Sequence, residues 1–189
     1  MNLQEQTNRI KQMMGVIKES EDKDLILYHG SNTTKIFDTF KDNQFYTPND
    51  YIASNYAYNF GGVMYKVSVD NLNSFDLKGY HEDKESEKHN MMTGLLMDLY
   101  GQNDVDYYKG NYFNPSPSVI FSEKGWSPII EWSKDNGYDS IKFIDESFDT
   151  YVRGISYVIF DGNKPIITNV YDVTEAVESN FKKDFTTIK

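Results

Sequence analysis

The sequence predicts a mixed α+β fold, because strand patterns and helix patterns both recur along the chain. Residues 63–69, VMYKVSV, place four apolar side chains on one face at a two-residue period, which is typical of a half-buried strand. Residues 25–28, LILY, form a short apolar run that indicates a buried strand. Between these two segments, apolar side chains recur at the three- and four-residue spacing of one helix face: Ala53, Tyr56, Ala57 and Phe60.

The other expected elements follow from the same periodicities and from turn signals. Short strands are expected at 75–77, 140–144, 157–160 and 166–170, and a helix at 91–100. A further helix is expected from Ser127, because Pro128 suits a first turn and Gly137 follows its end.

The helix that carries Tyr56 has start and stop signals of its own. Thr47 has a good N-cap side chain, and Pro48 suits the first helical position. Gly61 and Gly62 then end the helix.

The length of 189 residues favours one domain with a real hydrophobic core. Residues 1–20 are predicted to form a separate amphipathic helix, which packs on the domain or pairs with a copy of itself. The domain then spans 21–189, with a helical insertion at about 79–126. A second interpretation rests on Ile17-Lys18-Glu19, which resembles the end of capsid-targeting peptides that a phage prohead protease removes; residues 1–19 would then be cleaved off.

Composition excludes several function classes. The net charge of −10 argues against broad binding to a nucleic-acid backbone, although not against a local basic site. With no cysteine there is no disulfide framework, thiol nucleophile or thiolate zinc site, and His81 and His89 lack a metal-ligand spacing. No apolar run is long enough to span a membrane and no secretory signal is visible, so we expect a cytoplasmic protein.

Three consecutive segments form a recognisable pattern: YHGS at 28–31, FYTPNDYIASNYA at 45–57 and GGVMYKVSV at 61–69. In this order they resemble the NAD-binding half of the diphtheria-toxin-like ADP-ribosyltransferases. Members of that family have a strand that ends in His-Gly, then a Phe-Tyr-Ser/Thr strand that opens a helix with a second tyrosine. A weaker match, NGYDSIKFI followed by SYVIFDGNKPI, resembles phage and bacterial relatives.

The resemblance implies two small, mostly antiparallel sheets that form an NAD cleft, with helices around them. NAD would be a consumed substrate, which agrees with the absence of a G-x-G-x-x-G fingerprint, and no metal is expected. The rings of Tyr46 and Tyr56 would line the cleft and hold the nicotinamide. The positions that would bind NAD are His29, Gly30, Ser31, Tyr46, Thr47 and Tyr56.

The chain departs from the family at the catalytic acid. Aligning SYVIFD on the family pattern puts Ser156 where a strand glutamate would stand. A hydroxyl cannot supply the negative charge that stabilises an oxocarbenium-like transition state, so an active enzyme needs a substitute acid. The nearest are Asp145, Glu146 and Asp149. We expect Glu146 to act there, because it directly follows the expected strand and its side chain is longer.

The expected function is mono-ADP-ribosyl transfer from NAD to a macromolecule, a host protein being the expected target, in a phage or bacterial setting. The protein would then act in the host cytoplasm or travel in a phage virion. The alternative is a catalytically inactive binding or virion-packaged structural protein, which the missing strand glutamate favours. The related RNA 2′-phosphotransferase function needs several arginines, and only Arg9 and Arg153 exist here.

Overall fold

The computed structural model describes residues 24–31, 33–60, 62–77, 87–103, 121, 124–146, 153–173 and 186–187; for 58–60, 88, 146, 153, 186 and 187 only the backbone is described. The chain divides into two compact units. The sheet unit comprises Asp22–Leu72 and Asp145–Lys189, and the helical unit comprises Met1–Glu21 and Asn73–Ile144. The helix expected at 1–20 and much of the insertion expected at 79–126 lie outside the described residues.

The described residues confirm a mixed α+β fold. The helices are α2 (Asp50–Phe60), α3 (Glu87–Tyr100) and α6 (Ser127–Asp135). The strands belong to two small sheets. The helix expected at 91–100 begins one turn earlier than predicted, and α6 begins and ends where its proline and glycine signals place it.

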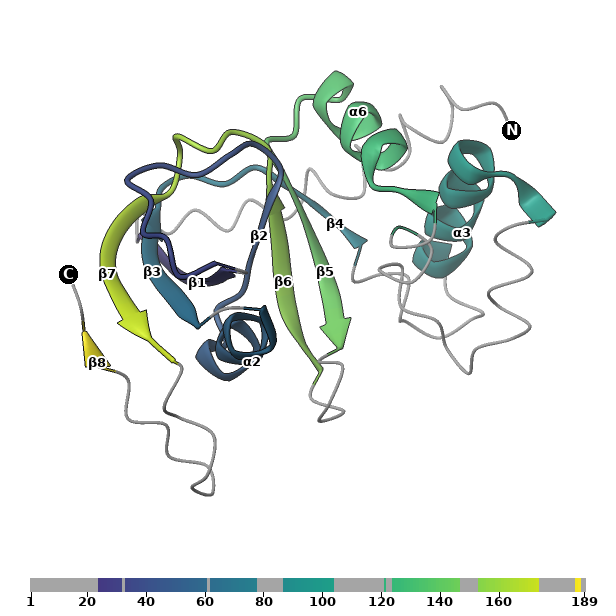
Figure 1. Ribbon diagram of the computed structural model, residues 1–189. Coiled ribbons are helices and arrows are strands. Elements are labelled where there is room, and N and C mark those ends of the chain that lie inside the picture. Colours follow the sequence, from purple (N-terminus) through teal and green to yellow (C-terminus); the bar gives the residue numbers. More distant parts are fainter. Residues whose placement is uncertain are drawn as a thin grey trace. The chain divides into compact units, whose positions relative to one another are not determined.

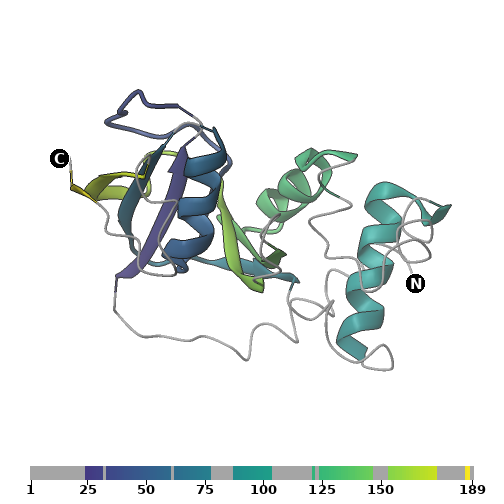
Figure 2. The same ribbon diagram turned by 60° about the horizontal axis from the view of Figure 1, so that its bottom comes forward.

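The first sheet lies in the sheet unit and is ordered β1-β3-β7-β8 (Figure 1). Its strands pair antiparallel throughout: β1 (Leu25–Ser31), β3 (Val63–Val69), β7 (Ile166–Asp172) and β8 (Thr186–Thr187). Helix α2 packs on β1 and β3, and Figure 2 shows it running alongside β1. Strand β1 is longer than expected, so His29, Gly30 and Ser31 lie within the strand and not after it.

A second strand pair in the same unit carries Tyr46 and Ser156. Strand β2 (Gln44–Tyr46) pairs antiparallel with β6 (Arg153–Ile159). Backbone hydrogen bonds in both directions between Tyr28 and Thr47 join β1 to the end of β2.

The two faces of β1 pack against different partners, because side chains alternate along a strand. Leu27 belongs to a cluster of buried apolar and tyrosine side chains that also holds Tyr46 and Tyr65. Tyr28 packs on the other face, against a small cluster that includes Ala53 and Ala57 of α2. Apolar burial on both faces makes this sheet the core of its unit.

The helical unit is held together by aromatic side chains around a parallel strand pair. Strand β4 (Ser74–Asp76) pairs with β5 (Ser140–Glu146), whose last two residues belong to the sheet unit. The ring of Phe75 lies 4.8 Å from that of Trp132 on α6. Among the described residues, no helix is both long and apolar enough to cross a membrane.

The start of α2 differs from the sequence expectation. The side-chain oxygen of Asn49 accepts hydrogen bonds from the amides of Tyr51 (3.0 Å) and Ile52 (3.2 Å), so Asn49 is the N-cap and the helix begins at Asp50. The Thr47 hydroxyl donates to the carbonyl of Ile155 on β6 (2.8 Å) and accepts from the amide of Asn49, which lies before the first helical residue. Pro48 therefore lies before the helix and not in its first turn.

Candidate functional site

Two hydroxyl groups converge on one buried carboxylate in the sheet unit. The Tyr56 hydroxyl, on α2, donates to Oδ2 of Asp145 at 3.3 Å, and the Ser156 hydroxyl, on β6, donates to the same oxygen at 3.4 Å. Asp145 is 7% exposed and Ser156 is 2% exposed. The resemblance aligns Ser156 with the strand glutamate of the family. Ser156 thus lies next to an acid, Asp145, that is far from it in sequence but close in space.

Burial sets the charge state of the tyrosine in this group. Burial, followed by the nearby Asp145 carboxylate and the hydrogen bond to it, raises the pKa of Tyr56 well above its ordinary value. The phenol therefore stays protonated and donates its hydrogen to Asp145 at any physiological pH. Two hydroxyl donors on one carboxylate oxygen also orient the side chain of Asp145.

The strand period explains why Asp145 faces Ser156. From Ile141 onward along β5, the buried side chains are Ile141, Phe143 and Asp145, at a two-residue spacing. The sequence contained a signal for this burial, because the two-residue period continued from Ile141 reaches Asp145. The side chain of Glu146 and the whole of Asp149 lie outside the described part of the structure, so the role expected of Glu146 stays a prediction.

His29 is held by the backbone of β2. Its Nδ1 lies 2.7 Å from the carbonyl oxygen of Phe45, and since a carbonyl can only accept, Nδ1 carries the hydrogen. Burial lowers the pKa of His29, and the bond to Phe45 raises it by less. The ring is therefore neutral around pH 7, and it fixes the backbone of β2 beside β1.

Tyr46 lies in the core and does not line a cleft as expected. It is 1% exposed, and its ring lies 5.3 Å from His29 and 5.5 Å from Phe40, centroid to centroid. Phe40 also lies 5.1 Å from Tyr65. The physical reason is register: Tyr46 pairs with Tyr157, on the face of β2 and β6 that packs into the apolar cluster. Burial raises the pKa of Tyr46, and its hydroxyl has no hydrogen-bond partner among the described residues.

Gly30 has a packing role that its place beside His29 does not reveal. A methyl group at this position would collide with the backbone of Ala53 and Ala57 and with the Cβ of Tyr56. Only glycine lets α2 approach β1 this closely. Gly30 thereby sets the position of Tyr56 over the sheet.

Ser31 and Thr47 both use their hydroxyls locally. The Ser31 hydroxyl accepts from the amide of Thr33 (3.3 Å), which turns the chain after β1. Thr47 links β2 to β6 through Ile155 and also accepts from the amide of Asn49 (3.1 Å). Both side chains are buried.

The positions expected to bind NAD are not brought together in one place. His29 and Tyr46 share one aromatic cluster, whereas Tyr56 meets Ser156 through Asp145. Side-chain alternation separates the groups, because His29 and Gly30 point to opposite faces of β1 and α2 covers the Gly30 face.

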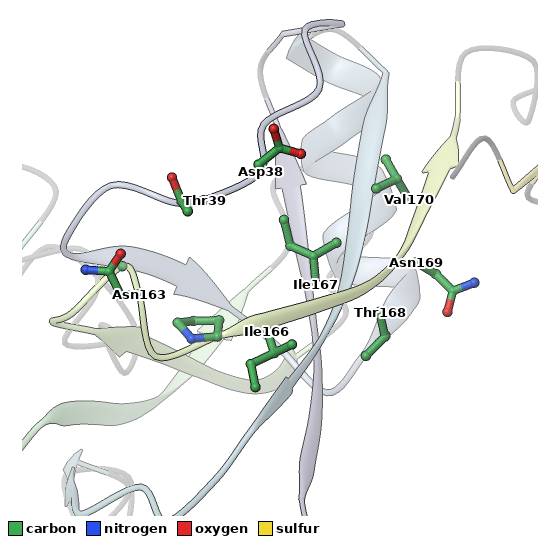
Figure 3. A pocket seen from close by; sticks show the side chains of 10 residues that line it. Asp38, Thr39, Asn163, Ile166, Ile167, Thr168, Asn169 and Val170 are labelled. Carbon is green, nitrogen blue, oxygen red and sulfur yellow. The ribbon is translucent and has the colours of Figure 1, made fainter.

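A pocket of about 390 Å³ lies elsewhere in the sheet unit, along β7 (Figure 3). Asp38 and Ile167 point toward one another there, and none of the six positions expected to bind NAD lines it. Within the described ranges, no three His, Asp or Glu side chains are grouped as metal ligands.

Comparison of the chain with family models, with curated proteins and with solved structures gives no match. The resemblance to ADP-ribosyltransferases therefore rests on sequence motifs alone, chiefly those at 28–31, 45–57 and 61–69.

Proposed function

We propose that this protein is an NAD-dependent mono-ADP-ribosyltransferase in which Asp145, not Glu146, is the catalytic acid. The observation that carries the proposal is the buried carboxylate of Asp145, which accepts from Tyr56 and from Ser156. Ser156 occupies the alignment position of the family glutamate, so the acid lies where the resemblance requires a negative charge.

The proposed reaction needs a negative charge beside the ribose of NAD. The bond between nicotinamide and C1′ of its ribose breaks, and its electron pair leaves on the nicotinamide nitrogen, which becomes neutral. Positive charge then develops on the ribose, and a fixed carboxylate in a water-poor site stabilises it. A lone pair of the acceptor forms the new bond to C1′, and the acceptor's proton passes to a base or to solvent.

The acceptor is a macromolecule, and a host protein is the expected class. The net charge of −10 favours a target other than nucleic acid. Such a target and NAD would both be present in the host cytoplasm.

The deciding experiment compares two neutral, nearly isosteric variants of neighbouring acids. Asp145→Asn keeps the shape and the ability to accept from both hydroxyls, and it should lower NAD turnover about 10²–10³-fold, the usual loss for one electrostatic group. Glu146→Gln is the matched control and should retain turnover. Turnover is measured with labelled NAD and a bacterial lysate, and thermal unfolding verifies that both variants fold. Full activity in Asp145→Asn would refute the assignment.

A second candidate function is a catalytically inactive member of the fold that binds a partner. The burial of Tyr46 in the core favours it, because that ring offers no open face to nicotinamide. A wild-type protein that neither binds NAD nor labels any band would support this candidate.

A further inference from the structure

We propose that the pocket along β7 binds an extended, basic peptide segment of a partner protein, which pairs with the edge of β7 as an added strand. The pocket is lined at 166–170, and none of Tyr56, Asp145 and Ser156 lines it. This binding surface is therefore separate from the acid group, and it stands or falls independently of the proposed function.

The pocket follows one strand and reaches both of its faces. All five residues at 166–170 line it. Ile167 pairs with Val67, which belongs to the apolar cluster. Its neighbour Ile166 pairs with Ser68, and the two isoleucine side chains point to opposite sides of β7 (Figure 3). A hollow lined from both faces of a strand lies along the edge of that strand, where the backbone is accessible.

The same edge of β7 already accepts a strand further along. Strand β8 pairs antiparallel with β7 at Tyr171 and Asp172, on the side away from β3. Among the described residues, 166–170 pair with β3 alone, so the outward N–H and C=O groups of β7 continue past the last pair with β8. An antiparallel peptide placed there would extend the line of β8 along the pocket.

The dimensions and the apolar surface of the pocket suit an extended segment. Five strand residues span about 13 Å from the first α-carbon to the last, at ~3.3 Å for each step. A segment of four or five residues matches that length. Ile166 is 62% exposed, and a strand partner that covers it would remove apolar area from water.

Charge complementarity selects a basic peptide. Asp38 is exposed and points toward Ile167 across the pocket. The other described residues that line the pocket are uncharged. The net charge of −10 adds a long-range attraction for a cationic partner. A lysine or arginine that projects from the added strand would therefore meet the Asp38 carboxylate.

The wall that carries Asp38 is held in place by the rest of the unit. The hydroxyl of Tyr65 accepts from the amide of Phe37 at 2.9 Å, directly before Asp38. The Asp42 carboxylate accepts from the amide of Gly162 at 3.0 Å, which joins this connection to the turn before β7. A methyl group at Gly162 would collide with the backbone of the same connection. A pocket with fixed walls loses little freedom when a peptide binds.

The test titrates the ¹⁵N-labelled full-length protein with the peptide acetyl-GTVKVTG-amide and follows the backbone amide signals by NMR. The largest changes should fall at 166–170. Asp38→Asn should weaken binding about 2- to 5-fold, the effect of one exposed ion pair. Asp50→Asn is the matched control, because Asp50 is an exposed acid of the same unit that does not line the pocket; its affinity should equal that of wild type. Thermal unfolding verifies that both variants fold.

Two further peptides test strand pairing directly. Each is methylated at alternate backbone amides, one at the odd and one at the even positions. Alternate amides of a strand point to opposite sides, so one methylated set would face β7 and the other would face away. One of the two peptides should bind at least about tenfold more weakly than the unmodified peptide, and the other should bind like it.

Four results would overturn the proposal. Equal binding of the two methylated peptides excludes an added strand, and signal changes confined to residues outside the pocket exclude the site. Equal affinity of wild type and Asp38→Asn excludes the ion pair that selects a basic segment. A protein that ignores the peptide but dimerises through 166–170 has a second copy of this chain as the occupant. Since none of these measurements involves NAD, each of them leaves the proposed function untouched.

Discussion

The cluster around Tyr46 and the group around Asp145 belong to the same unit and both include side chains of β6, yet their contacts are of opposite kinds. Tyr46 contacts the rings of His29 and Phe40, and its hydroxyl has no partner among the described residues. Tyr56 uses its hydroxyl on a carboxylate that a serine also contacts. Two tyrosines ten residues apart thus serve packing in one case and polar positioning in the other.

This difference teaches how each group should respond to substitution. Changes in the Tyr46 cluster should act on stability, because that cluster lies in the apolar core. Changes at Asp145 should act on turnover, because its carboxylate is the charge that the proposed chemistry needs. The predictions below test that division, beginning with the largest effect.

Replacing Tyr46 by alanine should lower the free energy of unfolding by about 3–5 kcal/mol, the usual cost of truncating a buried aromatic side chain to alanine. The loss follows from the cavity left beside His29 and Phe40, whose rings lie within 5.5 Å of the Tyr46 ring. Urea denaturation measures it.

Phe45→Ala is the control on the adjacent residue, and its half-exposed ring should cost much less. A Tyr46→Ala protein as stable as wild type would show that this ring lines an open cleft after all.

The periodic parts of the fold were predictable, and the polar contacts were not. The alternation at Val63–Val69 and the proline and glycine signals around α6 each predicted an element that the structure contains. These signals are local, since they depend on side-chain spacing within one segment. Tyr46 was assigned to a cleft because the motif gives its neighbours in sequence, whereas its burial depends on pairing with Tyr157, more than a hundred residues away.

The burial of Asp145 was not predicted for a related reason. The strand expected at 140–144 in fact runs to Glu146, and that extension places Asp145 on the buried face. Strand ends are weakly marked in sequence, because a single polar residue inside a strand looks like the start of a loop. The N-cap shows the same limit: Thr47 has the right side chain, but its bond to Ile155 is a contact that only the folded chain contains.

Removing the hydroxyls of Tyr56 and Tyr46 one at a time should change the free energy of unfolding by smaller amounts, which should differ between the two residues. Tyr56→Phe deletes a hydrogen bond to a buried carboxylate and should cost about 1 kcal/mol or somewhat more. Tyr46→Phe deletes a buried hydroxyl that has no partner among the described residues, so it should be neutral or slightly stabilising.

The two variants are matched, since each removes one oxygen from a tyrosine of the same unit, and urea denaturation compares them directly. If Tyr46→Phe costs as much as Tyr56→Phe, the Tyr46 hydroxyl has a polar partner, such as an internal water.

The smallest effect should be a pH dependence of stability that comes from His29. Burial lowers the pKa of His29 below its ordinary value of about 6.5, and the hydrogen bond to Phe45 offsets part of that decrease. Between the lowered pKa and about 6.5, the unfolded chain binds more protons than the folded chain, and the free energy of unfolding therefore rises with pH. The contribution is complete above pH 6.5 and is lost as the pH falls through the unfolded and then the folded pKa.

His29→Asn keeps an N–H donor for the Phe45 carbonyl but does not titrate. Denaturation of both proteins from pH 5 to 8 gives a difference in which the carboxylates and the other two histidines cancel. That difference should grow in favour of His29→Asn as the pH falls below 6.5; a difference that stays constant with pH would mean that His29 has the same pKa folded and unfolded.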